Sequence, residues 1–282
     1  MNILEVNSLK KHYNNFDLED VSFSIPEGTI MGLIGENGAG KSTVINIIIG
    51  AVNKDEGRVA IFDKDTKNTD YTIRNDIGTV LAGCGFPEEL CASDTNGILK
   101  SIYSNWNEKK FFDSLSKFSL DKKKKIKDYS TGMKMKLELA VALSHSAKLL
   151  ILDEVTNGLD PMARNEILDI LLDFIQDEKC GVLISSHIIG DLEKICDYIT
   201  FIHEGKLVFS EEKDELLEKY AVINVDEQKL SELDEKAVVS LDKTKFSSKA
   251  LVIKNMIPRD FEVEKTSIED IMLFYMKRGA DK

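Results

Sequence analysis

The chain has 282 residues, 43% of them hydrophobic, which is enough for one large α/β domain and a smaller appendage. Its formal net charge of −12, with a pI near 5.0 and one short basic run at residues 122–125, argues against nucleic acid as a partner. The N-terminus lacks a signal-peptide layout, no apolar run approaches the roughly 18–20 residues of a membrane span, and the four cysteines show no C-x-x-C spacing. We therefore expect a reduced, cytosolic protein without a zinc or disulfide framework.

The first third of the chain is predicted to consist of short strands around a glycine-rich loop. Apolar patterns indicate strands at residues 6–13, 18–25, 30–34, 58–62 and 77–81. The loop, residues 35–43 with the sequence GENGAGKST, directly follows the third of these strands. A helix-like apolar run at residues 44–49 comes next.

Strand, loop and helix start together fit the phosphate-binding pattern G-x-x-x-x-G-K-[ST]. Its glycines let the backbone approach phosphate oxygens, and the N–H groups at the start of the following helix favour an anion. Lys41 would bridge the β- and γ-phosphates, and Ser42 would bind Mg²⁺ through its hydroxyl. An ordinary glycine-rich turn is the alternative, but it does not account for the complete pattern. The nucleotide contacts expected from this loop are Gly35, Glu36, Asn37, Gly38, Ala39, Gly40, Lys41, Ser42 and Thr43.

The middle of the chain alternates helices with buried strands. Residues 87–127 and 133–144 have helical periodicity, whereas residues 149–152 and 181–185 are continuous apolar runs typical of parallel strands. The Asp-Pro pair at residues 160–161 predicts the N-cap and first residue of another helix. This alternation predicts an α/β fold with a mostly parallel sheet covered by helices on both faces.

Composition changes after about residue 210, and residues 211–282 are predicted to form a small α+β appendage. A charged helix is expected at residues 211–219, and strands at residues 221–225, 237–241 and 250–253. Residues 266–269, with the sequence TSIE, fit a capping box that begins a final helix.

Four further segments, which follow the phosphate loop in a fixed order, indicate what the bound nucleotide is used for. In chain order they are STGM at residues 130–133, DE at 153–154, NGLD at 157–160 and SSH at 185–187. With the loop, they resemble the Walker A, signature, Walker B, D-loop and switch-histidine motifs of the ATP-binding subunit of ABC transporters. The resemblance covers residues 1 to about 210. It implies a P-loop NTPase domain over residues 1–210, with an antiparallel N-terminal β subdomain and an α-helical subdomain at about residues 86–145.

The two carboxylates that end the buried strand have separate expected roles. Open α/β sheets bind ligands at the carboxyl ends of their strands, so Asp153 could hold Mg²⁺ while Glu154 orients and deprotonates the attacking water. Without the phosphate loop, a surface turn would explain both residues. The resemblance implies that His187 contacts the γ-phosphate, although a lone histidine in that place could instead be a packing residue.

Other site residues follow from the resemblance. Ser130 and Gly132 lie at a helix N-terminus, where Ser130 taken alone is an N-cap. In ABC ATPases this helix end faces the γ-phosphate on the opposite subunit, so that two chains enclose two ATP molecules, and Asp160 belongs to the nearby D-loop. Tyr13 occupies the place of an aromatic residue that stacks on adenine, with a half-buried strand tyrosine as the alternative.

The sequence departs from the usual family pattern at three positions. Ala82 stands where most members have glutamine, and alanine cannot bind Mg²⁺ or orient water. Thr131 and Met133 replace glycine and glutamine in the signature, while its serine and second glycine are retained. These variants and the segment at residues 267–272 resemble exporter-type subunits, including relatives of bacitracin- and lantibiotic-resistance ATPases.

The leading hypothesis is an ATPase, with ATP and Mg²⁺ as cofactors, that powers a separate membrane permease for export of an antimicrobial peptide, drug or lipid-like cargo. It would be cytoplasmic, peripheral on the inner face of the cell membrane, and a homodimer or heterodimer. Residues 84–106 would contact the permease, with the alternative that their aromatic and apolar members (Phe86, Leu90 and Trp106) belong to the core. The alternative is a non-transport ABC ATPase that acts on a soluble assembly. A P-loop kinase or GTPase would not use the signature or the histidine, and the guanine-reading N-K-x-D motif is not found.

Overall fold

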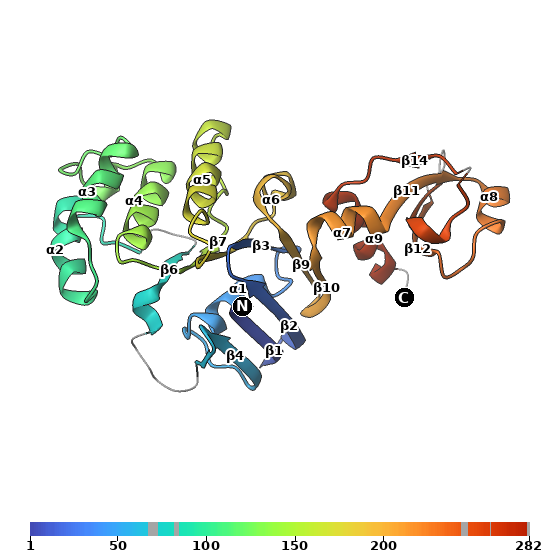
Figure 1. Ribbon diagram of the computed structural model, residues 1–282, viewed down its shortest axis with the longest axis horizontal. Helices are drawn as coiled ribbons and strands as arrows, with labels where there is room; N and C mark the ends of the chain where they lie inside the picture. The colour runs from blue at the N-terminus through green and yellow to red at the C-terminus, as the bar shows by residue number, and fades with distance from the viewer. Residues whose placement is uncertain (67–72, 82–84, 244–247, 260, 281–282) are drawn as a thin grey trace. The chain divides into compact units, whose positions relative to one another are not determined.

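The computed structural model describes residues 1–66, 73–81, 85–243, 248–259 and 261–280 (Figure 1). The chain divides into two compact units, Met1–Val208 and Phe209–Lys282. This division lies close to the expected boundary at residue 210, and independent folding of the two parts stays a prediction. Among the helices within the described ranges, none is both long and apolar enough to span a bilayer.

A ten-stranded sheet forms the centre of the first unit. In spatial order it runs β5-β4-β1-β2-β10-β9-β3-β8-β7-β6. The strands are β1 (Asn2–Tyr13), β2 (Phe16–Pro26), β3 (Thr29–Ile34), β4 (Glu56–Ile61), β5 (Lys64–Asp65), β6 (Ile77–Val80), β7 (Leu149–Asp153), β8 (Gly181–Ser185), β9 (Tyr198–His203) and β10 (Lys206–Glu212). The helices are α1 (Lys41–Ile48), α2 (Ala92–Ile102), α3 (Glu108–Lys117), α4 (Thr131–Leu143), α5 (Pro161–Phe174) and α6 (Ile189–Ile195), with 3₁₀ turns η1 (Ile73–Asp76) and η2 (Ile126–Asp128).

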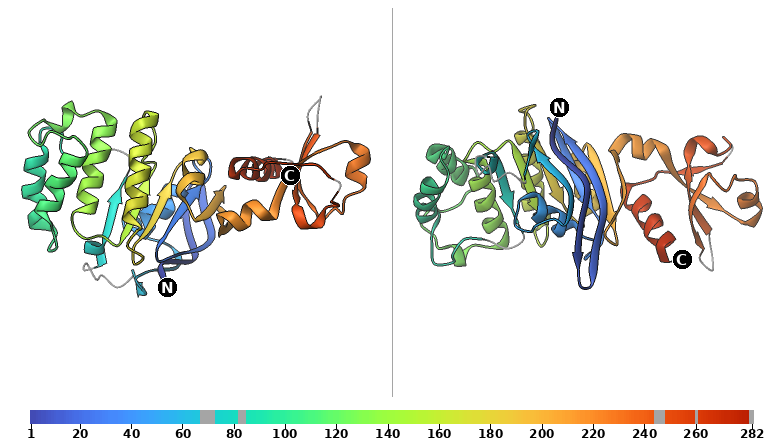
Figure 2. Two further views of the ribbon diagram at one scale, coloured as in Figure 1. Left: turned by 45° about the horizontal axis from the view of Figure 1, so that its top comes forward. Right: turned by 90° about the horizontal axis from the view of Figure 1, so that it is seen from below.

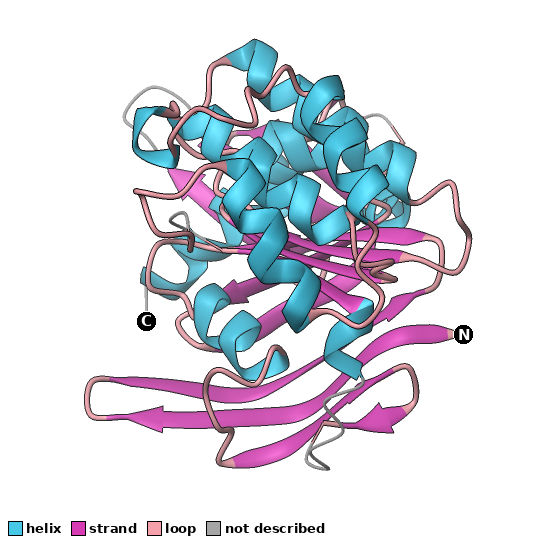
Figure 3. Cartoon of the chain, turned by 90° about the vertical axis from the view of Figure 1, so that its left-hand side faces the viewer, coloured by secondary structure: helices cyan, strands magenta, loops and turns pink. Residues whose placement is uncertain are grey.

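The sheet has an antiparallel part and a parallel part, so the predicted fold class is confirmed. Strands β1, β2, β4 and β5 pair antiparallel, whereas β3, β6, β7, β8 and β9 pair parallel. Figure 3 shows the antiparallel strands as a layer of their own, apart from the parallel strands and their helices. Apolar residues of α1 share one core with both parts, because β1 and β2 contribute to the same buried cluster as β7 and β8.

The central parallel strands bring their carboxyl ends to one place. Strands β3, β8 and β7 are neighbours in register, with Leu33 opposite Ser185 and Ser185 opposite Asp153. Residues of β7 and β8 are buried throughout, which fits the continuous apolar runs in the sequence. The loops that follow these three strands therefore begin side by side.

The stretch predicted to be helical between residues 87 and 127 contains two separate helices, α2 and α3. They lie with α4 at one end of the unit, as the green ribbons of Figure 2 show. Phe111 and Leu115 of α3 are buried, and α3 packs against α4. Ala82, the position of the usual glutamine, lies outside the described residues.

The second unit has a four-stranded antiparallel sheet, in the order β12-β13-β11-β14. Its elements are α7 (Lys213–Lys219), β11 (Tyr220–Val225), α8 (Glu227–Ser231), β12 (Val238–Lys243), β13 (Ser248–Ile253), η3 (Lys254–Met256), β14 (Val263–Glu264) and α9 (Ile268–Ala280). The helix predicted from residue 211 begins at Lys213, because the two preceding glutamates end strand β10.

The predicted capping box at α9 is wrong by one residue. Ser267, not Thr266, is the cap: its hydroxyl accepts from the backbone N–H of Asp270, and the Asp270 carboxylate accepts from the N–H of Ser267. Thr266 instead bonds the neighbouring strand, where its hydroxyl accepts from the N–H of Val222. Sheet pairing therefore decides which of the two hydroxyl residues begins the helix.

Candidate active site

The phosphate loop lies between β3 and α1, and two of its glycines combine an unusual backbone angle with close neighbours. Gly35 and Gly40 have φ values of +154° and +112°. A Cβ on Gly35 would lie 2.3 Å from the carbonyl oxygen of Ile202, and one on Gly40 would lie 2.9 Å from Cζ of Phe16. The loop therefore requires both unusual backbone angles and close contact with its neighbours.

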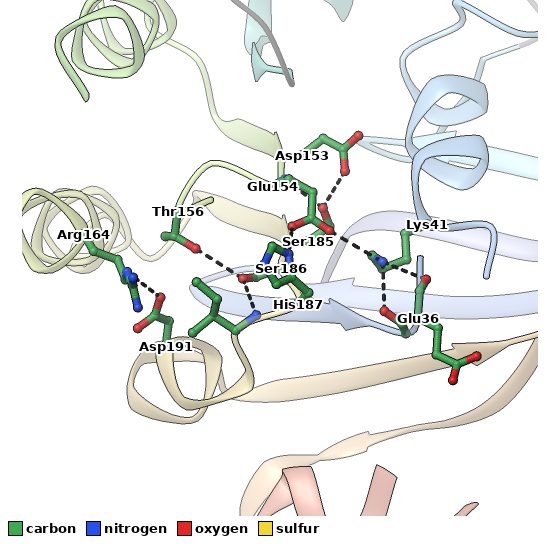
Figure 4. A network of polar contacts seen from close by, with 12 residues as sticks. Glu36, Lys41, Asp153, Glu154, Thr156, Arg164, Ser185, Ser186, His187 and Asp191 are labelled. Carbon is green, nitrogen blue, oxygen red and sulfur yellow. Dashed lines mark hydrogen bonds and ion pairs between the residues drawn. The ribbon is translucent and has the colours of Figure 1, made fainter. Parts of the chain in front are cut away.

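Lys41 is held inside this loop. Its side chain is only 6% exposed, and its Nζ donates to the carbonyl oxygens of Gly35 at 2.9 Å and Glu36 at 3.1 Å. The same Nζ lies 3.5 Å from Oε1 of Glu154 (Figure 4). The structure thus brings the loop lysine to the carboxylate that follows β7.

Asp153 and Glu154 are both fixed by Ser185, the last residue of β8. The Ser185 hydroxyl donates to Oδ1 of Asp153 at 2.5 Å and accepts from the backbone N–H of Glu154 at 3.0 Å. Ser185 is completely buried, so this arrangement is not a surface turn. Glu154 has a φ of +54°, a conformation that costs free energy for a non-glycine residue.

His187 contacts Glu154 rather than packing in the core. Its Nδ1 lies 2.7 Å from Oε2 of Glu154, and its side chain is 43% exposed. Figure 4 shows Glu154 between His187 and Lys41, with each nitrogen close to one carboxylate oxygen. These three residues from three separate segments form one polar cluster.

The cluster borders a pocket of about 580 Å³, a size suited to a small-molecule ligand. The residues that line it are Asn15, Phe16, Asn37, Gly38, Gly40, Lys41, Ser42, Thr43, Glu154, Asn157 and His187. Tyr13 does not line it: this side chain is 44% exposed, and its ring centroid lies 6.4 Å from that of Phe16.

Sequence reasoning did not select Asn15, Phe16, Asn157 or Ser185 for the site. Phe16 begins the strand next to Tyr13, so the hairpin turn between β1 and β2 was a usable signal for it. Ser185 belonged to a motif already singled out, but only its tertiary contacts show that it holds both carboxylates.

Ser130, Gly132 and Asp160 lie at helix N-termini and do not line this pocket. The Ser130 hydroxyl caps α4 by accepting from the N–H of Met133 at 3.3 Å. Asp160 caps α5, and the backbone N–H groups of Ala163 and Met162 that donate to its carboxylate hold its pKa below the usual value. Within one chain, Ser130 and Asp160 therefore act as caps, and Gly132 lies in the first turn of α4.

The fold and the pocket define a P-loop nucleoside triphosphatase. A model of the ABC transporter family matches residues 18–157. The chain is 36% identical to the lantibiotic transport ATP-binding protein SrtF of Streptococcus pyogenes, over 75% of this chain and 92% of that protein. It is 32% identical to the bacitracin transport ATP-binding protein BcrA of Enterococcus faecalis, over 81% of this chain and 76% of that one. The chain belongs to the ATP-binding subunits of ABC transporters and is an ATPase.

Solved structures agree with this assignment. The structure of the ATP-binding subunit of an ABC transporter matches with a TM-score of 0.69 at 28% identity, covering 76% of this chain and 91% of that one. The cbiO1 protein of Clostridium perfringens matches with a TM-score of 0.66 at 25% identity, covering 76% and 90% of the two chains.

Proposed function

We propose that this chain hydrolyses ATP with Mg²⁺ to drive a separate membrane permease that exports an antimicrobial peptide or a related drug. The cluster of Lys41, Glu154 and His187 at the edge of the phosphate loop is the observation that supports hydrolysis. The export proposal rests on the relatives, which are named for lantibiotic and bacitracin transport.

The residues that line the pocket, together with the adjacent Asp153, have separate proposed roles. The loop N–H groups and Lys41 bind the phosphates, and Glu154 accepts a proton from the attacking water while His187 holds its carboxylate in place. Ser42 and Asp153 supply hydroxyl and carboxylate oxygens, which are the donors that Mg²⁺ prefers, so these residues fit the ion. Mg²⁺ would neutralise charge on the phosphates.

The nucleotide is proposed to be enclosed by two chains. Ser130 and Gly132 at the start of α4, together with Asp160, would face the γ-phosphate bound to a partner, since none of them lines the chain's own pocket. Tyr13 would stack on adenine, with Phe16 as the adjacent wall.

The permease is proposed to contact α2 and the segment before it. Ile98 and Ile102 lie one turn apart on α2 and are 46% and 63% exposed. Two large apolar side chains on one exposed helix face fit a protein partner. The chain would then lie on the cytoplasmic face of the membrane, held there by that partner.

Glu154→Gln tests the assigned chemistry. The change removes the proton acceptor but keeps the shape, so ATP affinity should stay within about threefold while turnover falls by at least about 100-fold, or roughly 2.7 kcal/mol in activation free energy. Calorimetry and a phosphate-release assay measure the two quantities. Turnover close to that of the wild type would show that Glu154 is not the proton acceptor.

The same variant tests the sandwich. A site without the Glu154 carboxylate, which binds but does not hydrolyse ATP, should accumulate the closed dimer, and size-exclusion chromatography with ATP would detect it. A monomer under saturating ATP would contradict a sandwich of two identical chains and favour a different ATPase as partner.

A further inference from the structure

One face of helix α4 carries three residues that contact β6 and the segment before α2. Lys134, Glu138 and Ala142 are spaced by four, so they lie on one helix face. Ala142 meets β6 closely, since a Cβ on Gly78 would lie 3.0 Å from its Cβ. The other two residues contact the segment at residues 85–90, which we call the connecting segment.

Glu138 is the charged residue on this face that is buried. Its side chain is only 8% exposed, and its Oε1 accepts from the backbone N–H of Gly85 at 2.9 Å. One turn earlier, the Nζ of Lys134 lies 3.2 Å from Oε1 of Glu88. A carboxylate in a buried place requires hydrogen-bond donors, and a bond to a charged acceptor is stronger than a neutral one. The ion pair between Lys134 and Glu88 is more exposed to solvent, so it contributes less to holding the segment against α4.

The connecting segment is also joined to η2. The backbone N–H of Ile126 donates to the carbonyl of Leu90 at 2.9 Å, and that of Lys127 donates to Glu88 at 3.0 Å. Ser130 lies between η2 and α4 in the sequence, so the elements on both sides of it are bound to the same segment.

We propose that Glu138 is a positioning residue that makes the connecting segment and α4 move as one body, so that a displacement of the segment reaches Ser130 at the helix tip. The inference rests on the proposed function for its consequence, because the segment leads into the exposed face of α2 where the permease is proposed to bind. A push on that face would then alter how the Ser130 tip meets a partner's nucleotide. Glu138 touches no substrate and acts only through α4.

Two substitutions in the full chain separate the hydrogen bond from packing. Glu138→Met keeps an unbranched side chain of similar length but removes the acceptor, and Glu138→Gln keeps an acceptor oxygen. Hydrogen exchange measured by mass spectrometry would follow residues 85–91 and residues 130–137, and steady-state kinetics would give kcat and KM.

The Met variant should exchange faster in both segments, and its kcat should fall about tenfold with KM for ATP changed less than about twofold. The Gln variant should retain at least half of the wild-type kcat. Faster exchange at residues 85–91 alone, with residues 130–137 and kcat unchanged, would overturn the proposal.

Two further variants complete the test. Lys136 lies on the same helix but pairs with Glu166 of α5, so Lys136→Met should leave exchange at residues 85–91 unchanged. Lys134→Met removes the ion pair with Glu88 at a partly exposed position, so the variant should fold even if Glu138→Met does not. Exchange in both segments should be faster than in the wild type. No acceleration at residues 130–137 in that variant would count against the linkage. Hydrogen exchange is measured on the single chain and does not require a dimer. Absence of an ATP-dependent dimer would therefore count against the proposed ATP sandwich, whereas the exchange rates would still test whether the connecting segment and α4 move together.

Discussion

Glu154 has an unfavourable backbone conformation, and its side chain is held by neighbouring residues. Its φ of +54° lies in the left-handed region, yet Ser185 holds its backbone N–H, and His187 and Lys41 lie at its two carboxylate oxygens. Strain of about 1–3 kcal/mol persists only where the surroundings compensate for it, and such residues cluster at functional sites. The backbone and carboxylate of Glu154 are thus held by contacts from two other segments, the phosphate loop and the end of β8 with the residues that follow it.

Lys41→Ala should remove most of the affinity for ATP. The change deletes the buried cation of the pocket and two hydrogen bonds that shape the loop, so the dissociation constant should rise at least about 100-fold, or roughly 2.7 kcal/mol. Calorimetry with ATP measures it. Lys124→Ala, at an exposed lysine away from the pocket, is the control and should bind ATP as the wild type does. Unchanged binding by Lys41→Ala would refute its phosphate role.

At the scale of elements, a histidine joins η1 to the helical part. His145 follows α4 and is buried; its ring stacks on Tyr103 with centroids 4.2 Å apart and planes 8° apart. Its Nδ1–H donates to the carbonyl oxygen of Asn75 in η1 at 2.8 Å. The amide of Asn105 donates to the same carbonyl at 3.3 Å. This joint fixes the C-terminal end of α4 while its N-terminal tip carries Ser130.

The joint gives the protein a pH dependence with a definite sign. Burial lowers the pKa of His145, so the unfolded chain takes up the proton at a higher pH than the folded one. The stability contributed by the neutral ring is complete above the ordinary pKa of about 6.5 and is lost as the pH falls through the folded-state pKa. Asp76 and Lys110 are the nearby charges, and they oppose one another.

His145→Phe tests this sign, because phenylalanine can still stack on Tyr103 but cannot bind a proton. Melting temperatures at about pH 7.5 and pH 5.5, on either side of that pKa, should fall less in the variant than in the wild type. The comparison is between the two pH values within each protein, so a uniform loss from the missing Asn75 hydrogen bond does not affect it. Equal falls in both proteins would contradict the role of His145.

At the scale of the whole chain, β10 belongs to the nucleotide-binding part although it crosses into the second unit. The turn before it supports the phosphate loop, because the N–H of Gly205 donates to the carbonyl of Ala39 at 3.0 Å. Lys206 of β10 pairs with Glu19 of β2. We therefore propose that the ATPase part ends after Glu212, where the strand ends.

A chain ending at Glu212 should keep its ATP affinity within about threefold of the full chain, a difference of less than about 1 kcal/mol. A chain ending at His203 is the matched control: it lacks β10 and the Gly205 support, and it should bind at least about tenfold more weakly or fail to fold. Calorimetry measures both. Loss of binding in the longer chain would show that the second unit is needed for the site.

Much of this arrangement is predictable from the order of residues along the chain. Buried strands such as β8 are predicted residue for residue, because continuous apolar runs between polar loops leave few alternatives. The phosphate loop is equally clear, since its spacing follows from local backbone geometry. Errors lie where local signals compete, as at residues 266 and 267, where either hydroxyl could cap α9 and sheet pairing engages the first.

By itself, the sequence determined the class of fold and the nucleotide loop, and it selected the two carboxylates that are proposed to act in hydrolysis, because those depend on short-range patterns. Only the tertiary structure decided that Ser185 orients both carboxylates, that Phe16 rather than Tyr13 lines the pocket, and that Glu138 reaches Gly85. Each of these depends on strands and helices that are distant in the chain being packed side by side, and no spacing within one segment records such a contact.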